Sequence, residues 1–279
     1  MQSNNPVFRR SEEFNTAGAQ RQTGYTDPST WGTGTPGQPG VQTPVATTGG
    51  PMTIDSVVQK TAIALGVVLI TAAATWILSP SIDADTTTPA DISGLIAAAS
   101  IGALLAFVLS MVNSFKRVIS PALVLLFCAA EGVALGGISK VFELAYPGIV
   151  MSAVLGTFGA FAGTLAVYKF FNIKVTDKFR RMVVAAMLGV VAISLIEVVL
   201  SLFGAEIGLF GDGALGLIFA VVGLALGVFM LVLDFDFVEQ GVANGIPDRE
   251  GWRAAFAMTV SLVWIYTNLL RILAIFSDN

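Results

Sequence analysis

The sequence contains no histidine and only one cysteine, Cys128. The absence of histidine excludes the zinc sites of membrane metalloproteases and the serine–histidine pair of rhomboid-type proteases. One cysteine excludes both an intramolecular disulfide and a metal site built from several cysteines. Proton chemistry near neutral pH therefore has to depend on carboxylates whose proton affinity is changed by their surroundings.

Charged residues are scarce as well, at 12% of the 279 residues, whereas soluble proteins have about 25%. Hydrophobic residues make up 54%, which is typical of an integral membrane protein. The net charge of −4 argues against nucleic acid as a partner, because phosphate contacts need a basic surface. No glycine-rich phosphate loop is present, and Asp234 and Asp236 share one predicted helix, unlike the catalytic pair of an intramembrane aspartyl protease. We therefore predict a protein that is not an enzyme and carries no cofactor.

The first part of the chain differs from the rest. Residues 1–52 are rich in Gly, Pro, Thr and Gln and poor in aliphatic side chains. Such a segment cannot bury enough apolar surface to offset its chain entropy. We expect a disordered polar tail over 1–52 and a transmembrane domain over 53–279.

Long apolar runs dominate the second part. A bilayer core requires about 20 apolar residues per helix, and the runs show no alternation of period two, which argues against a β-barrel. The sequence predicts an all-α integral membrane protein with seven transmembrane helices. The division at Tyr146-Pro147-Gly148 is the least certain of the boundaries. The predicted spans are 57–78, 92–112, 121–142, 149–171, 182–203, 215–236 and 254–276.

Among the segments that flank and connect these spans, basic residues alternate with acidic ones. This pattern predicts a multi-pass protein of the cell membrane with a cytoplasmic N-terminus and an external C-terminus. One set of segments contains Arg9, Arg10, Arg21, Lys60, Lys116, Arg117, Lys174, Lys178, Arg180, Arg181, Arg249 and Arg253. The other set contains Asp83, Asp85, Asp91, Glu143, Glu206 and Asp212.

Five ionisable residues stand out within the spans, and each is costly there, by roughly 2.5–3.5 kcal/mol at a helix centre. Glu131 lies near the middle of the third span, far from either interface. Glu197 and Arg271 have similar depth and opposite charge, so a structural ion pair and a transport role both remain open. Asp234 and Asp236 end the sixth span.

Asp234 and Asp236 point to different sides of their helix, because residues two apart diverge by about 200°. We expect one of them to face protein and the other to face the interface, where a carboxylate reaches water. Asp236 could simply mark the membrane edge. Asp234 would then face a protein-lined vestibule, where it could bind a cation together with carbonyl groups and water.

Several motifs together resemble one family. "EGVALGGI" in the third span, "DFDFVEQGVANGIPDREGW" after the sixth and "NLLRIL" in the seventh are similar to the bacterial branch of the Bax inhibitor-1 family, as is "SNNPVF" near the start. The resemblance covers roughly residues 52–276 and is most specific in the last third.

The resemblance implies a pH-sensitive calcium leak in which the seventh helix is central and is wrapped by the other six. A pair of aspartates on helices 6 and 7 shares a proton, and an arginine on helix 2 pairs with one of them. The helix 6 member corresponds to Asp234, with Asp236 as the fallback. The helix 7 member corresponds to Ser261, which cannot ionise, and the second span has no arginine. The chain therefore departs from the family's gate at two places.

Two carboxylates held close together cannot both ionise comfortably, and protonation of one can shift a two-state arrangement of helices. The candidate couplings are Asp234 with Asp236 and Asp234 with Glu131. The leading hypothesis is a cation leak channel or exchanger, with membrane lipid and calcium or another cation as partners. The alternative is a membrane scaffold that binds a protease or an envelope protein, and the sequence does not identify that partner.

Overall fold

The computed structural model describes residues 50–80, 89–171 and 173–277. Over these residues the chain is all-α, with seven helices that are long and apolar enough to cross a membrane. The predicted tail, 1–52, lies almost wholly outside the described residues. The helices are α2 (Ile54–Leu78), α3 (Pro89–Phe115), α4 (Pro121–Ala145), α5 (Ile149–Phe170), α6 (Asp177–Leu202), α7 (Ala214–Ala243) and α8 (Gly251–Ser277), with the short 3₁₀ helix η4 (Asp248–Glu250) before α8.

Local sequence signals set the ends of these helices. Thr53 and Thr176 cap α2 and α6 by accepting backbone N–H groups, and Pro121 opens α4. The predicted division between the third and fourth spans is confirmed. α4 ends at Ala145, and Gly148 makes the turn with φ of 88°, a conformation that favours glycine. α7 extends to Ala243, well beyond the predicted limit of 236.

The connections fall at two ends of the helical domain, which we call the basic end and the acidic end. The basic end contains the start of α2, residues 116–120, 171 and 173–176, and residues 244–250. The acidic end contains the end of α2, residues 146–148, residues 203–213 and the end of α8. Contacts between segments far apart in sequence hold the basic end together: Met52 N–H donates to the Ile246 carbonyl at 2.8 Å, and Arg249 Nε donates to the Ile119 carbonyl at 2.9 Å.

Lys60 also belongs to these contacts at the basic end. The sequence analysis counted its charge with the N-terminal segment, but the residue lies within α2. It lies in the second turn of α2 and is 9% exposed. Its Nζ forms a salt bridge with Asp248 Oδ2 at 2.7 Å and also donates to the Asp248 carbonyl. Ser56 Oγ donates to the other oxygen of the same carboxylate. The connection between α7 and α8 is thereby fixed to the start of α2.

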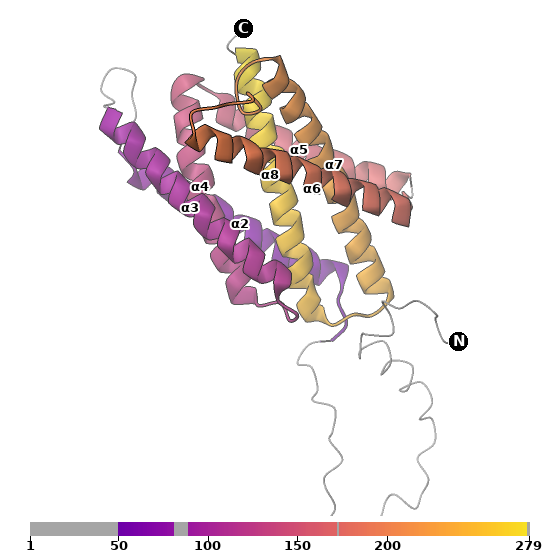
Figure 1. Ribbon diagram of the computed structural model, residues 1–279. Helices are drawn as coiled ribbons and strands as arrows, with labels where there is room; N and C mark the ends of the chain where they lie inside the picture. Colours follow the sequence, from indigo (N-terminus) through magenta and orange to yellow (C-terminus); the bar gives the residue numbers. More distant parts are fainter. Residues whose placement is uncertain (1–49, 81–88, 172, 278–279) are drawn as a thin grey trace, which may run out of the picture. The chain divides into compact units, whose positions relative to one another are not determined.

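α8 is the central helix, as the family resemblance implies. It packs against α2, α4, α5 and α7, and half of its membrane-spanning window is buried. In Figure 1 this helix, drawn in yellow, runs between its neighbours along its length. α3 packs mainly on α4, and α6 packs on α7. Four helices, and not all six, therefore surround α8.

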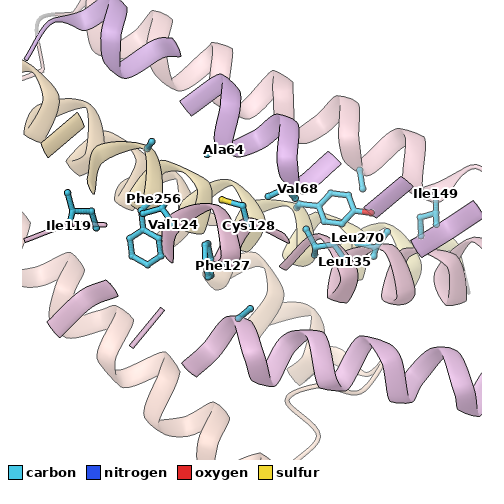
Figure 2. Close-up of a cluster of buried hydrophobic side chains, with 14 of the residues drawn as sticks. Ala64, Val68, Ile119, Val124, Phe127, Cys128, Leu135, Ile149, Phe256 and Leu270 are labelled. Atoms are coloured by element: carbon cyan, nitrogen blue, oxygen red, sulfur yellow. The ribbon is translucent and has the colours of Figure 1, made fainter. Parts of the chain in front are cut away.

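Apolar side chains from several helices form a core on one side of α8. Figure 2 shows Val68 of α2, Phe127 and Cys128 of α4, and Phe256 and Leu270 of α8 within this cluster. The rings of Phe127 and Phe256 meet edge to face, with centroids 4.9 Å apart. A second cluster lies on another side of α8, and its buried residues are Met52, Val57, Leu231, Phe235, Val238, Ala254, Met258, Leu262 and Ile265.

Glycines allow α4 to approach α2 closely. A Cβ on Gly132 would overlap the hydroxyl of Thr71 and the carbonyl of Val68. A Cβ on Gly136 would lie 2.5 Å from the Ala72 carbonyl. This is the role of small residues expected in membrane helices, where close backbone approach replaces the hydrophobic effect as the source of packing energy.

α6 is attached very differently. In this helix of 26 residues, only Val183, Val190 and Glu197 are buried. These three residues are seven apart, so they form one narrow stripe along the helix. α6 therefore contacts the rest of the bundle along a single line, and most of its surface faces outward.

Candidate functional site

Asp234 lies on the side of α7 that faces the central helix. Its Oδ2 accepts a hydrogen bond from Ser261 Oγ of α8 at 2.6 Å. Ser261 is fully buried, and Asp234 is partly buried. None of the salt bridges among the described residues involves Asp234. The carboxylate is therefore held by one neutral hydroxyl and has no basic partner in this part of the chain.

The position that corresponds to the family's second acid is thus in contact with the first. The resemblance placed Ser261 opposite Asp234, and the structure brings these two residues together. A hydroxyl can donate to an ionised carboxylate, and it can also accept from a protonated one. The site therefore accommodates both protonation states of Asp234, with a single carboxylate where the resemblance implies two.

This pair is deep in the bundle. Asp234 precedes the end of α7 at Ala243 by nine residues, and Ser261 follows the start of α8 at Gly251 by ten. At 1.5 Å per residue, both lie about 14–15 Å along their helices from the basic end. α7 has 30 residues and α8 has 27, so the pair lies about a third of the way along each helix from the basic end.

Glu131 lies at a similar depth, ten residues after the start of α4 at Pro121. Its carboxylate is partly buried and has no hydrogen-bond or salt-bridge partner among the described residues. One turn earlier on the same face of α4 lies Cys128, which is fully buried and contacts Thr259 of α8. Glu131 is therefore the second acid near the middle of the bundle.

The two acids lie on different sides of the central helix. Ser261, which binds Asp234, and Thr259, which contacts the α4 face that carries Glu131, are two residues apart on α8 and so point about 200° apart. α4 and α7 do not pack against each other along their lengths. The hypothesis that Asp234 and Glu131 couple directly across their helices is therefore not supported, because α8 stands between them.

Asp236 is bound by protein side chains, whereas one interpretation of the sequence had it simply reach water at the membrane edge. It is 7% exposed, and its Oδ2 forms a salt bridge with Arg180 Nη2 of α6 at 2.7 Å. Gln240, one turn later on α7, donates to the same oxygen at 2.7 Å. The expectation that one aspartate faces protein and the other the interface is wrong, because Asp234 faces α8 and Asp236 faces α6.

Direct coupling between Asp234 and Asp236 is also not supported by the geometry. Their side chains diverge around α7, and each is bound to a different neighbouring helix. Glu239, further along α7, accepts a hydrogen bond from Tyr168 of α5 at 2.5 Å. The last three turns of α7 therefore carry three acids directed at α8, α6 and α5.

Glu197 and Arg271 do not form the ion pair that the sequence left open. Both instead bind the backbone of the connection between α6 and α7. The carboxylate of Glu197 accepts three N–H groups, from Ile207, Gly208 and Leu209. Arg271 Nη2 donates to the Leu209 carbonyl at 2.6 Å. The two charges therefore fix the same connection at the acidic end from two different helices.

Lys140 was missed by the sequence analysis, which considered acidic residues within the spans and basic residues in the connections but not a lysine within the third span. It is 7% exposed, and its Nζ donates to Ser79 Oγ and to the carbonyls of Trp76, Ser79 and Pro80. A cation is favoured at a helix C-terminus, where carbonyl groups lack partners. An isolated lysine in an apolar run was the signal that could have identified this contact.

Arg180 was also misread, as a solvent-exposed charge of a loop. It is the fourth residue of α6, and its guanidinium reaches Asp236. The signal in the sequence was indirect. An aspartate that lies inside a membrane span needs a partner, and the basic segments offered several, of which Arg249 is nearer to it in sequence than Arg180.

No group of three or more His, Cys, Asp or Glu side chains suited to a metal ion occurs among the described residues. A cation near Asp234 would have the Asp234 carboxylate and the Ser261 hydroxyl as its protein oxygens. Such a set is small compared with the six to eight oxygens of a high-affinity calcium site. It suits transient contact with a partly hydrated ion rather than storage.

The chain was also compared with known proteins. The model of a family described as Bax inhibitor 1 like matches residues 5–278, which is essentially the whole chain. No curated protein matches the sequence.

Proposed function

The chain belongs to the Bax inhibitor 1 like family, and from this premise we propose that it is a pH-modulated leak pathway for cations, with calcium as the permeating ion. The observation that carries the proposal is the carboxylate of Asp234. It lies within the helical bundle, it is bound by the hydroxyl of Ser261, and no basic residue neutralises it among the described residues.

A carboxylate in this position has two states that differ in what they bind. When ionised, it attracts a cation, and calcium prefers oxygen ligands such as a carboxylate and a hydroxyl. When protonated, it loses that attraction and hydrogen-bonds to Ser261 as a neutral group. The pH dependence of the leak arises from this exchange between proton and cation at one acid, without the second acid that the resemblance implies.

The salt bridge between Arg180 and Asp236 holds the pathway closed in this proposal. It attaches α6 to α7 two residues from Asp234, and apart from it α6 is held by its narrow buried stripe, the edge-to-face contact of Phe179 with Phe229 of α7 and the hydrogen bonds of Glu197. Movement of α6 would therefore disturb few apolar contacts. α6 is the helix whose displacement from α7 costs least, and its release would free α7, which holds Asp234 against α8, to move.

We further propose that the basic end faces the cytoplasm, in the inner membrane of a bacterium. The distribution of Lys and Arg supports this orientation. Lys140, near the acidic end, does not oppose it, because its charge is bound to the carbonyls at the end of α2.

The test is a calcium flux assay on the purified full-length protein in liposomes with a calcium dye enclosed. Wild type is expected to admit calcium above protein-free vesicles, and Asp234→Asn to lower the initial rate at least severalfold. Asp55→Asn is the matched control, since Asp55 is exposed in the first turn of α2. It should leave the rate unchanged.

Two outcomes would contradict the proposal. Equal flux in wild type and Asp234→Asn would remove Asp234 from the pathway. Absence of flux from folded wild-type protein in every vesicle preparation would favour the alternative function, a scaffold that binds a protein partner without transport.

A further inference from the structure

An apolar groove opens between α2 and α5 in the half of the bundle nearer the acidic end. Its volume is about 460 Å³, within the range of small-molecule sites in proteins. α2 contributes residues from Leu65 to Ile77, α5 forms the facing wall, and α4 and α8 form the floor. α2 and α5 do not pack against each other along their lengths, so the groove is open on its outer side.

The lining presents almost no free polar group. Ser139 and Tyr266 on the floor are hydrogen-bonded to each other at 2.6 Å. Thr157 on the α5 wall donates to the Ala153 carbonyl of its own helix. An occupant of the groove therefore has no polar partner over most of its length, so it must itself be apolar.

The dimensions of the groove restrict the shape of the occupant. Leu65 and Ile77 are twelve residues apart on α2, which corresponds to about 18 Å. A volume of about 460 Å³ is enough for one hydrocarbon chain of that length. An α-helix with its side chains is about 10–12 Å across and covers about 80–110 Å². A helix from a second copy or from another protein could therefore only rest across the open side of the groove, whereas a single hydrocarbon chain can lie within it.

The length also agrees with a lipid chain. Half of a bilayer's hydrocarbon core is about 15 Å thick, close to the 18 Å of the groove. The groove runs from the acidic end, where Trp76 lies one turn from the end of α2, toward the middle of the bundle. The indole N–H of Trp76 has no acceptor among the described residues, and tryptophan is common where lipid chains meet headgroups.

We propose that this groove is a binding site for one acyl chain of a membrane lipid from the leaflet at the acidic end. The lipid's ester region lies near Trp76, and its chain extends along α2 and α5 over Tyr266. The polar N-terminal residues 1–52 are chemically unsuited to the groove, because an unpaired peptide backbone would be costly there. The site is separate from Asp234 and does not depend on whether the protein conducts ions.

The experiment uses the full-length protein in vesicles that contain a phospholipid with a photoreactive group in its acyl chain. After irradiation, labelled residues are identified by mass spectrometry. The groove is expected to be labelled at least severalfold more than Leu188, which is 65% exposed on α6 and represents ordinary lipid contact. Val154→Trp, which fills the groove, should remove that excess.

Leu155→Trp is the matched control. Leu155 neighbours Val154 but is 64% exposed and does not line the groove, so this variant should keep the wild-type labelling. If Val154→Trp does not fold, Ala73→Phe on the exposed α2 wall fills the same space. Labelling of the groove no stronger than at Leu188, or unaffected by both filling variants, would overturn the proposal. So would cross-links that place a second copy's helix in the groove.

Discussion

The two sides of the bundle are held together by different kinds of contact. On the α2–α4 side, glycines bring helix backbones into contact, and a lysine fixes the end of α2. On the α6–α7 side, α6 buries a stripe of three residues and is anchored by polar contacts near its ends, Arg180 to Asp236 at one and Glu197 to a connection at the other. The first arrangement resists displacement, whereas the second can change when a few charges change. The acid that we place in the pathway, Asp234, lies on the α7 side of the central helix.

The largest expected effect comes from disturbing the packing of α4 on α2. Gly132→Ala places a Cβ where Thr71 and Val68 already lie, so α2 and α4 must separate. We expect a strong loss of folded protein, measured as monodisperse material after purification and as thermal midpoint in detergent. Gly159→Ala on α5 is the control, because nothing lies within 4 Å of its added Cβ. Equal stability of the two variants would show that the α2–α4 contact is not a tight one.

The next largest effect is expected where α6 contacts α7. Arg180→Ala removes the salt bridge to Asp236 and leaves α6 with its narrow apolar stripe. We expect the calcium leak rate in liposomes to rise severalfold while the protein stays folded. Arg181→Ala is the matched control, since within the described residues Arg181 bonds only to a carbonyl of its own helix, that of Asp177. A leak that falls or stays constant in Arg180→Ala would remove this salt bridge from the gate.

A third prediction restores the missing acid. Ser261→Asp places a second carboxylate beside Asp234, and two carboxylates so close retain one proton to higher pH than one alone. The pH at which the leak changes should therefore move upward. Ser261→Asn, of similar size but unable to ionise, separates charge from size. An identical pH profile in the two variants would contradict a proton-linked role for this pair.

The smallest effect is expected at Lys140. Lys140→Met removes a cation that binds three carbonyls and one hydroxyl near the end of α2. Hydrogen bonds to charged groups contribute about 1.5–3 kcal/mol, and the loss should lower the thermal midpoint by a few degrees without changing the leak rate. Lys169→Met, at an exposed residue in the last turn of α5, should leave the midpoint unchanged.

Hydropathy was sufficient to predict the seven spans, because each helix has to match the same bilayer thickness. The turn at Gly148 and the contact between Asp234 and position 261 were also accessible, the second only through the family resemblance. The turn is encoded in one short segment, whereas the contact joins two helices and was reached by matching both to the family.

The partners of the other buried charges could not be predicted. Glu197 binds backbone N–H groups, which no side-chain pattern reveals, and Arg180 reaches Asp236 across more than fifty residues of chain. Periodicity also failed on α6, whose hydrophobic residues surround the helix because lipid and protein are equally apolar neighbours. In a membrane domain the sequence pattern therefore locates the helices but does not show which face of each helix packs against another helix.

The most direct test of the central claim is the ratio of calcium leak rates at pH 6 and pH 8 in the same liposome preparation. For wild type we predict rates that differ severalfold between the two pH values, and for Asp234→Asn a ratio close to one. A ratio in Asp234→Asn that equals the wild-type ratio would show that the proton acts elsewhere, and it would contradict the role proposed for Asp234.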